Sequence, residues 1–322
     1  MRILTHHDVV RTLPMADCVV AMKQALIDLA NGAYYLPLRL KARPEGEPNR
    51  MGFMPALRLA DDRRLWSVKE ICVTPANGAR GLDPHQGMVI LHDGYDGRPL
   101  GIVDASSITA IRTAAVTAVA TAALMPRDVR KVAIIGAGVQ AAAHVDAMRV
   151  VVPESAEIVI ANRSPGRAAQ LAEEKHCSFA PTIQEGLADA DIVCTVTGSY
   201  EPILKLDWLK PGCHINAVGS SLAVARELDG PTMKAVELFV DRRESAINES
   251  GEYIFAVQEG FIGPDHIRAE LGDVLTARHP GRTSQNQITC FKSLGLAVED
   301  LAAAELALQN AARLNIGTNV DW

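Results

Sequence analysis

The stretch "KVAIIGAGVQAAAHVDAMRVV", residues 131–151, decides the fold of this chain. It begins with a short apolar run, passes through two glycines and continues with apolar residues at helical spacing. This order predicts a buried strand, a tight turn and a helix. The turn has the pattern G-x-G-x-x-A, which lets the backbone approach a pyrophosphate at the helix N-terminus. The cofactor-binding residues predicted here are Gly136, Gly138, Val139 and Gln140.

Short apolar segments alternate with helix-like segments beyond this stretch. Strands that are apolar on both faces and separated by helices predict a parallel sheet that is covered on both sides. We therefore predict an α/β fold with a Rossmann-type doubly wound parallel sheet. The further strand-like runs are "EIVIANR" (157–163), "DIVCTVTG" (191–198), "HINAVGS" (214–220) and "LFVD" (238–241).

The N-terminal third has a different pattern. Alternating apolar and polar residues predict antiparallel strands, and "DGYDGRP" (93–99) predicts a hairpin turn from its Asp-Gly pairs. The C-terminal stretch 293–314 predicts a long helix with an apolar stripe. We expect the doubly wound domain, residues 119–299, to be inserted into a discontinuous α+β domain formed by residues 1–118 and 300–322.

The composition excludes several classes of protein. The net charge is −6 without a basic run, and aromatic residues are only 4% of the chain, so we expect no nucleic-acid partner. The N-terminus lacks a signal-peptide pattern, and no uninterrupted apolar run has the length of a membrane span, so we expect a soluble cytoplasmic protein. The six cysteines are scattered singly, which indicates free thiols, and no spacing predicts a metal site.

The end of the second strand bears on the choice of dinucleotide. An acid at this place would bind the ribose 2′-hydroxyl of NAD, but the sequence here is Asn162, Arg163 and Ser164. An arginine beside an amide and a hydroxyl suits a 2′-phosphate. We therefore predict NADP(H) as the preferred cofactor, with NAD(H) possible; the alternative is that Arg163 is a solvated loop residue.

Two later strands end in small residues, in "CTVTGS" (194–199) and "NAVGSS" (216–221). The carboxyl ends of parallel strands border the crevice in which a ligand of this fold binds. Such endings also occur in ordinary turns between strands and helices. The cofactor-side residues predicted here are Thr195, Val196, Thr197, Val218 and Gly219.

A single arginine interrupts the apolar helix predicted for "SSITAIRTAAVTAVATAAL", residues 106–124. A guanidinium cannot lose its charge and is costly to bury alone, so Arg112 requires an anion. That anion is either a ligand or an internal acid. We expect Ser106 or Ser107 to cap this helix, and Thr113 to lie on the cofactor side.

Motifs along nearly the whole chain resemble those of the ornithine cyclodeaminase/mu-crystallin family. They include "LPLRL" (36–40), "MPAL" (54–57), "VKE" (68–70), "ITAIRTAA" (108–115), "IGAGVQA" (135–141), "HINAVGSS" (214–221), "RELD" (226–229), "ESGE" (249–252) and "CFKSLGLAVEDLAAA" (290–304). The motifs are most similar to those of the mu-crystallin-like ketimine reductase branch.

The resemblance implies a homodimer whose first domain binds the substrate and forms the dimer. It also implies that three cations, Arg39, Lys69 and Arg112, hold the carboxylate of an α-amino or α-imino acid. Other interpretations are a solvated Arg39, a Lys69 paired with Glu70 or another acid, and an internal salt bridge of Arg112. Met54 and Ser221 are the predicted substrate-pocket residues.

One departure from the family pattern favours reduction over cyclodeamination. Cyclodeaminases of the family carry an aspartate just after "NAVG", whereas this chain has Ser220 and Ser221, and its next acid is Glu227. We therefore predict reduction of an α-imino acid, such as pyrroline-2-carboxylate or piperideine-2-carboxylate, by hydride transfer from NAD(P)H, with Lys69 tuning protonation. The alternatives are an amino-acid dehydrogenase or reductive aminase, a cyclodeaminase with catalytic NAD, and a non-enzymatic ligand-binding protein.

Overall fold

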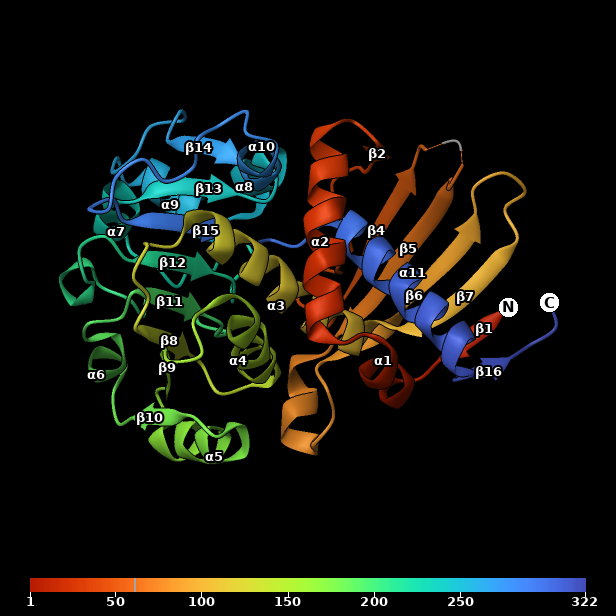
Figure 1. Ribbon diagram of the computed structural model, residues 1–322, viewed down its shortest axis with the longest axis horizontal. Coiled ribbons are helices and arrows are strands. Elements are labelled where there is room, and N and C mark those ends of the chain that lie inside the picture. Colours follow the sequence, from red (N-terminus) through yellow and green to blue (C-terminus); the bar gives the residue numbers. More distant parts are fainter. Residues whose placement is uncertain (61) are drawn as a thin grey trace. The chain divides into compact units, whose positions relative to one another are not determined.

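The computed structural model describes residues 1–60 and 62–322, which form two compact units (Figure 1). The first unit contains Met1–Arg112 and Leu296–Trp322, and the second contains Thr113–Gly295. The division falls inside helix α3 (Ala105–Leu124), earlier than the boundary after residue 118 that the sequence suggested. The second unit is thus inserted into the sequence of the first.

The first unit is built on a mostly antiparallel sheet. Its longest strands pair antiparallel in chain order, and the predicted hairpin at 93–99 joins β6 to β7. The strand order is β16 (Thr318–Asn319), β1 (Arg2–Leu4), β7 (Pro99–Asp104), β6 (His85–Asp93), β5 (Leu65–Val73), β4 (Arg50–Arg58) and β2 (Tyr34–Tyr35), with β3 (Leu40–Ala42) also paired to β4.

Helices cover one face of this sheet. The C-terminal helix α11 packs against β4, β5, β6 and β7, and α1 and α2 pack against α11 (Figure 1). The covered face includes a cross-strand row of five buried residues: Met54, Lys69, Val89, Val103 and Leu4. Lys69 is the only charged side chain in that row. The helices of this unit are α1 (His6–Thr12), α2 (Met15–Ala30), α11 (Ala297–Leu314), the first part of α3 and the short turn η1 (Pro75–Arg80).

The opposite face of the sheet carries a parallel row that is only half-buried. Its five members lie directly opposite one another on neighbouring strands and are all apolar. Strand side chains alternate between faces, so this row points away from α11. The members of this outer row are Pro55, Val68, Ile90, Ile102 and Ile3.

The second unit is the predicted doubly wound domain, and this prediction is confirmed. All strand pairs in its sheet are parallel. Each residue of β11, β12 and β15 is buried, which requires cover on both faces. The strand order is β10 (Ser178–Ala180), β9 (Glu157–Ala161), β8 (Lys131–Ile135), β11 (Ile192–Thr195), β12 (His214–Ala217), β15 (Thr289–Lys292), β13 (Glu237–Val240) and β14 (Ile267–Glu270).

The strand order reverses at β8, because the chain runs from β8 outward to β9 and β10 and then returns to β11 on the other side. Ligands of this fold bind outside the carboxyl ends of the strands at such a switch point. The connecting helices are α4 (Val139–Val151), α5 (Pro165–Lys175), α6 (Ile183–Leu187), α7 (Gly230–Ala235), α8 (Arg243–Glu249), α9 (Gly251–Gln258) and α10 (Leu271–Leu275), with the turn η2 (Leu206–Trp208).

Helix α3 has the length and apolar composition of a membrane span, but 78% of its most apolar window is buried inside the structure. This burial is typical of the core helix of a folded domain. The expected caps of this helix were wrong. Asp104, not Ser106 or Ser107, caps it, because the Asp104 carboxylate accepts the Ser107 backbone N–H at 2.8 Å.

Candidate active site

The glycine loop after β8 has the geometry of a dinucleotide fingerprint. Gly136 has a φ of +137°, and a Cβ at this position would lie 2.9 Å from the carbonyl oxygen of Val196. Its backbone N–H donates to the carbonyl of Ala161 at 2.8 Å. Only glycine tolerates this backbone and this spacing, so the loop can turn tightly at the end of β8.

The N-terminus of α4 is open to a ligand. Gly138 is the N-cap and offers no side-chain cap, so the first N–H groups of the helix point out of it. A Cβ at Gly138 would meet no atom within 4 Å, and the following Val139 is 63% exposed. The buried Oε1 of Gln140 has no hydrogen-bond partner among the described residues. Free donors and an unused acceptor at an open cradle fit the pyrophosphate region of a dinucleotide.

Residues after β9 form a basic turn without an acid. Arg163 and Ser164 are exposed, and Asn162 is half-buried with its side-chain amide donating to the Ser164 carbonyl at 3.4 Å. Ser164 is the N-cap of α5 and Pro165 is its first residue, but the serine side chain does not cap the helix. Arg167, in the first turn of α5, is also exposed. Sequence reasoning missed this second arginine, although its spacing from Arg163 on a predicted helix could have revealed it.

The ends of β11 and β12 are fastened together by an acid from outside both strands. Thr195, Thr197 and Gly219 all donate hydrogen bonds to the fully buried Glu227. Thr195 is completely buried, so its side chain helps to fix the strand end that borders the crevice and is not exposed to a ligand. Val196 and Val218 are nearly buried at 7% and 8% exposure.

Residues farther along the loop after β12 include the predicted pocket residue Ser221. Ser221 is half-buried, whereas the Ser220 hydroxyl donates to the carbonyl of Ala225 at 2.7 Å. Thr113, at the start of the second unit, is 8% exposed, and its carbonyl accepts the Thr117 hydroxyl at 3.0 Å. The predicted cofactor residues and Ser221 thus belong to the second unit, and Arg39, Met54, Lys69 and Arg112 to the first.

Lys69 and Arg112 meet inside the first unit at a pair of acids. The Asp300 carboxylate accepts the Lys69 ammonium and the Arg112 Nε, each at 2.9 Å. Glu299 accepts Arg112 Nη1 at 2.6 Å, and Thr109 accepts the Lys69 ammonium at 3.3 Å. All four charged side chains are at most 4% exposed. We call Lys69, Arg112, Glu299 and Asp300 the charge cluster.

The charge cluster leaves one part of the guanidinium available. Arg112 uses Nε and Nη1 for the two acids, and its Nη2 makes no hydrogen bond to any residue that the structure describes. Two positive and two negative charges make the cluster neutral. The two acids hold the cations in place without adding a net negative charge that would repel a carboxylate ligand. Met54 lies directly opposite Lys69 in the sheet register, next to the ammonium stem.

The pKa of Lys69 is lowered from 10.5 to about 8. Burial is the main cause, and the positive charges of Arg112 and Arg39 add to it, whereas Asp300 opposes it. Arg39, in the half-buried segment before β3, therefore lies close enough to act on the ammonium. Desolvation contributes more to this shift than the charges of the two arginines.

A family model described as the ornithine cyclodeaminase/mu-crystallin family matches residues 1–314. The chain belongs to this family. The ketimine reductase mu-crystallin of Mus musculus is 39% identical over 261 residues, covering 80% of this chain and 79% of that protein. The family-model match, residues 1–314, includes all the segments from which the glycine loop and the charge cluster are built.

Two solved structures of related enzymes share the fold over essentially the whole chain. One is the Delta(1)-pyrroline-2-carboxylate reductase of Thermococcus litoralis in complex with NADH and L-proline, with a TM-score of 0.94, 33% identity and coverage of 99% of this chain and 100% of that chain. The other is an archaeal alanine dehydrogenase dimer with bound NAD, with a TM-score of 0.92, 28% identity and coverage of 100% and 99%.

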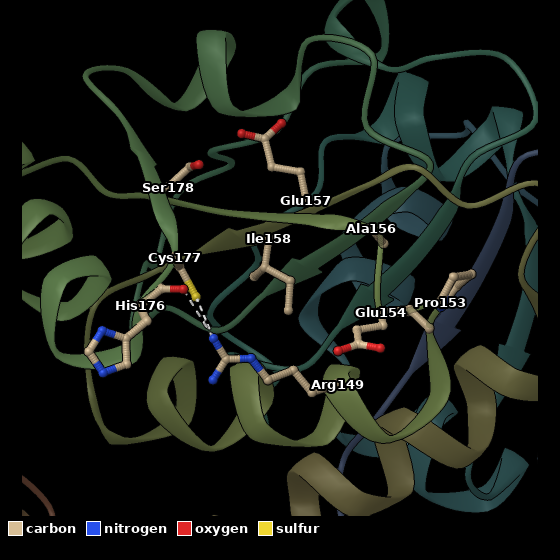
Figure 2. A pocket seen from close by; sticks show the side chains of 10 residues that line it. Arg149, Pro153, Glu154, Ala156, Glu157, Ile158, His176, Cys177 and Ser178 are labelled. Atoms are coloured by element: carbon tan, nitrogen blue, oxygen red, sulfur yellow. Dashed lines mark hydrogen bonds between the residues drawn. The ribbon is translucent and has the colours of Figure 1, made fainter.

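A hollow of about 740 Å³ lies near the amino ends of two strands of the second unit's sheet, opposite the edge that carries the glycine loop (Figure 2). It is lined where β9 and β10 begin, by Glu157, Ile158 and Ser178 among others. Arg149 reaches across it and donates to the carbonyl of Lys175 at 2.5 Å. Because family members of this fold bind dinucleotides at the carboxyl ends of the strands, this hollow is not the cofactor crevice.

The two glycines of the loop predict different effects of the same substitution. Gly138→Ala should leave the thermal unfolding temperature unchanged, because its Cβ meets no neighbour, but should weaken dinucleotide binding at least tenfold, about 1.4 kcal/mol. Gly136→Ala should lower both, since it strains the backbone and strikes the Val196 carbonyl. Calorimetry and fluorescence titration measure the two quantities. Equal behaviour of the two variants would contradict this assignment of roles.

Proposed function

We propose that this chain reduces a cyclic α-imino acid, such as pyrroline-2-carboxylate or piperideine-2-carboxylate, to the L-amino acid with NAD(P)H. The observation that carries the proposal is the charge cluster, which keeps a guanidinium and an ammonium buried and ordered for a carboxylate. The chain is an NAD(P)-dependent oxidoreductase of its family. The related pyrroline-2-carboxylate reductase, whose structure contains NADH and L-proline, supports this substrate class.

Bound reduced nicotinamide supplies the hydride for the imine carbon. Arg112 binds the substrate carboxylate through Nη2 while Glu299 and Asp300 fix the plane of its guanidinium. Lys69, protonated below about pH 8, holds a proton at Nζ for the imine nitrogen and adds a second positive charge near the carboxylate. Arg39 contributes positive potential from the segment before β3.

The fate of Glu227 favours reduction over cyclodeamination. It is the first acid after the "NAVG" segment, and a cyclodeaminase would need such an acid for the substrate amino group. In this chain its carboxylate is buried and accepts hydrogen bonds from Thr195, Thr197 and Gly219. Neither Ser220 nor Ser221 can replace an ionised acid.

The proposal is tested by kinetics over a panel of substrates with NADH and NADPH. Pyrroline-2-carboxylate or piperideine-2-carboxylate should give the highest kcat/KM. The similarity to an archaeal alanine dehydrogenase makes pyruvate with ammonium the second candidate, and pyruvate with methylamine tests reductive amination. A higher kcat/KM for either pyruvate reaction would overturn the imine assignment, and proline formation from ornithine without net cofactor turnover would indicate a cyclodeaminase.

We propose NADP(H) as the preferred cofactor, on the support of exposed Arg163 and Arg167 beside Ser164 and the absence of an acid among Asn162, Arg163 and Ser164. Arg163→Ala should weaken NADPH binding by about 10- to 100-fold, the loss of one charged hydrogen bond of ~1.5–3 kcal/mol. Binding of NADH should stay within twofold. Tighter binding of NADH than NADPH by the unaltered protein would refute the preference.

Substitution of Arg112 tests the carboxylate clamp. Arg112→Met should lower kcat/KM about 30-fold to several thousandfold, which corresponds to a loss of ~2–5 kcal/mol in transition-state binding. Cofactor affinity should be unchanged. Because Met removes the charge that Arg112 presents to Glu299 and Asp300, Arg112→Lys serves as the second variant: it keeps the charge and loses the fork geometry. Near-normal kcat/KM in both variants would contradict the clamp.

The pH dependence of reduction should report Lys69. Its pKa of about 8 lies below the ordinary value, so the protonated form is lost as the pH rises through 8. The kcat/KM for reduction should therefore fall about tenfold per pH unit above pH 8, and kcat/KM for oxidation of the amino acid should rise up to that pH. In Lys69→Arg the limb at pH 8 should disappear, because arginine stays charged. A limb that persists unchanged in this variant belongs to another group.

We propose that the chain forms a homodimer through the outer row of the first unit's sheet: Pro55, Val68, Ile90, Ile102 and Ile3. A continuous half-buried apolar row on the sheet face opposite α11 is typical of an interface between subunits. The related alanine dehydrogenase is a dimer, which supports the proposal. Ile90→Lys should convert the dimer to a monomer in light scattering, whereas a monomeric unaltered protein would overturn it.

A further inference from the structure

Glu227 is a buried acid that accepts hydrogen bonds from residues at the carboxyl ends of β11 and β12, the edge that borders the cofactor crevice. Its Oε1 accepts the Thr197 backbone N–H and the Thr197 hydroxyl, each at 2.7 Å. Its Oε2 accepts the Thr195 hydroxyl at 2.7 Å and the Gly219 backbone N–H at 2.8 Å. Glu227 is completely buried and lies on neither strand, yet it joins the segments that follow β11 and β12.

This bonding pattern favours an ionised carboxylate. Each of the two oxygens receives one backbone N–H and one hydroxyl. A glutamine would present a donating NH₂ to one of these pairs, and a protonated acid would offer one oxygen as a donor. Burial and the negative charge of Glu252 raise the pKa of Glu227 above its ordinary value, and the charge of Lys292 and the threonine hydrogen bonds oppose that rise. The four donors therefore favour the charged form.

The loops after β11 and β12, which Glu227 joins, are in close contact. A Cβ at Gly219 would lie 2.1 Å from the Thr197 carbonyl oxygen and 2.5 Å from the Glu227 Oε1. No side chain fits in that gap, which explains the glycine after Val218 in terms of packing rather than turn geometry. The segments 195–197 and 217–219 form one surface at the carboxyl ends of their strands.

Two further charged residues, Glu252 and Lys292, fix the loop that carries Glu227. Its backbone N–H donates to Glu252 at 3.1 Å, and Lys292 pairs with Glu252 at 3.2 Å and donates to the Ser220 carbonyl at 2.5 Å. Glu252 follows Gly251, where a Cβ would lie 2.0 Å from the Ala225 carbonyl. The segment "ESGE" (249–252) thus brings the start of α9 against the loop that carries Glu227.

We propose that Glu227 is a positioning residue for the nicotinamide half of the cofactor. The inference rests on the proposed function, because it assumes the dinucleotide site. The glycine loop and the basic turn after β9 receive the pyrophosphate and the adenosine half, and a dinucleotide extends across the crevice to the second half of the sheet. The surface that Glu227 assembles, at β11 and β12, is where the other nucleotide lies.

The test compares full dinucleotides with fragments that lack nicotinamide. Glu227→Gln should weaken NADPH binding at least tenfold in titration calorimetry and change the binding of 2′-phospho-ADP-ribose less than twofold. The same comparison with NADH and ADP-ribose covers the other cofactor. Glu201→Gln, an exposed acid on the loop after β11, is the control and should change neither. Thermal unfolding of the cofactor-free variants monitors the fold.

A second variant keeps the proposal testable if Glu227→Gln fails to fold. Thr195→Val removes one buried donor to Oε2 at nearly the same volume and should give a smaller loss confined to the full dinucleotide. Equal losses for dinucleotide and fragment in the folded variants would assign Glu227 a general structural role, and no loss at all would remove any role; either result overturns the inference. If the unaltered protein binds no dinucleotide, the proposed function itself fails.

Discussion

The first unit depends on four buried charges that no single one of its segments could hold alone. Removing an ion from water costs several kcal/mol, which its partners repay only with good geometry and satisfied hydrogen bonds. Asp300 meets this demand by bonding Lys69 and Arg112 at once, and Glu299 takes the remaining side of the guanidinium. Strand β5, helix α3 and helix α11 must therefore meet at one point. Well-packed apolar residues would stabilise such a core as well or better, so the retained charges point to a role beyond stability.

The second unit also buries a charged group, Glu227, but surrounds it with different partners. Glu227 is also buried and drawn from a distant segment, but its main partners are neutral donors rather than cations. Neutral donors fix a carboxylate in one orientation and leave its charge in place. The cations of the first unit are instead paired with acids, which raise the pKa of Arg112, whereas burial lowers the pKa of Lys69 to about 8. Glu227 thus holds two strand ends together, whereas Glu299 and Asp300 hold the two cations of the charge cluster in place.

Features with a local pattern could be predicted from the sequence. The loop at Gly136 and Gly138 and the hairpin at 93–99 each depend on neighbouring residues, and the structure has them where the pattern indicated. The partners of Arg112 could not be predicted, because they lie 187 and 188 residues away. Glu299 and Asp300 also occupy the first turn of α11, where acids are common for their effect on the helix dipole. Their place in the first turn of a helix therefore gives no local sign of these contacts. The capping of α3 by Asp104 was missed because two serines offered an equally good local signal.

The surroundings of the charge cluster bear on the kind of acid that binds it. The cluster is neutral before a ligand arrives, and the residues next to Lys69 in its row, Met54 and Val89, are apolar. A monocarboxylate adds one negative charge, which Arg112 Nη2 can bond directly, and its apolar remainder can pack against the methionine. A free amino group would bring a positive charge beside Lys69, and each would lower the other's pKa. A ring imine avoids this repulsion until it takes up a proton. The electrostatics of the first unit thus agree with a cyclic imino acid better than with an open-chain diamino acid.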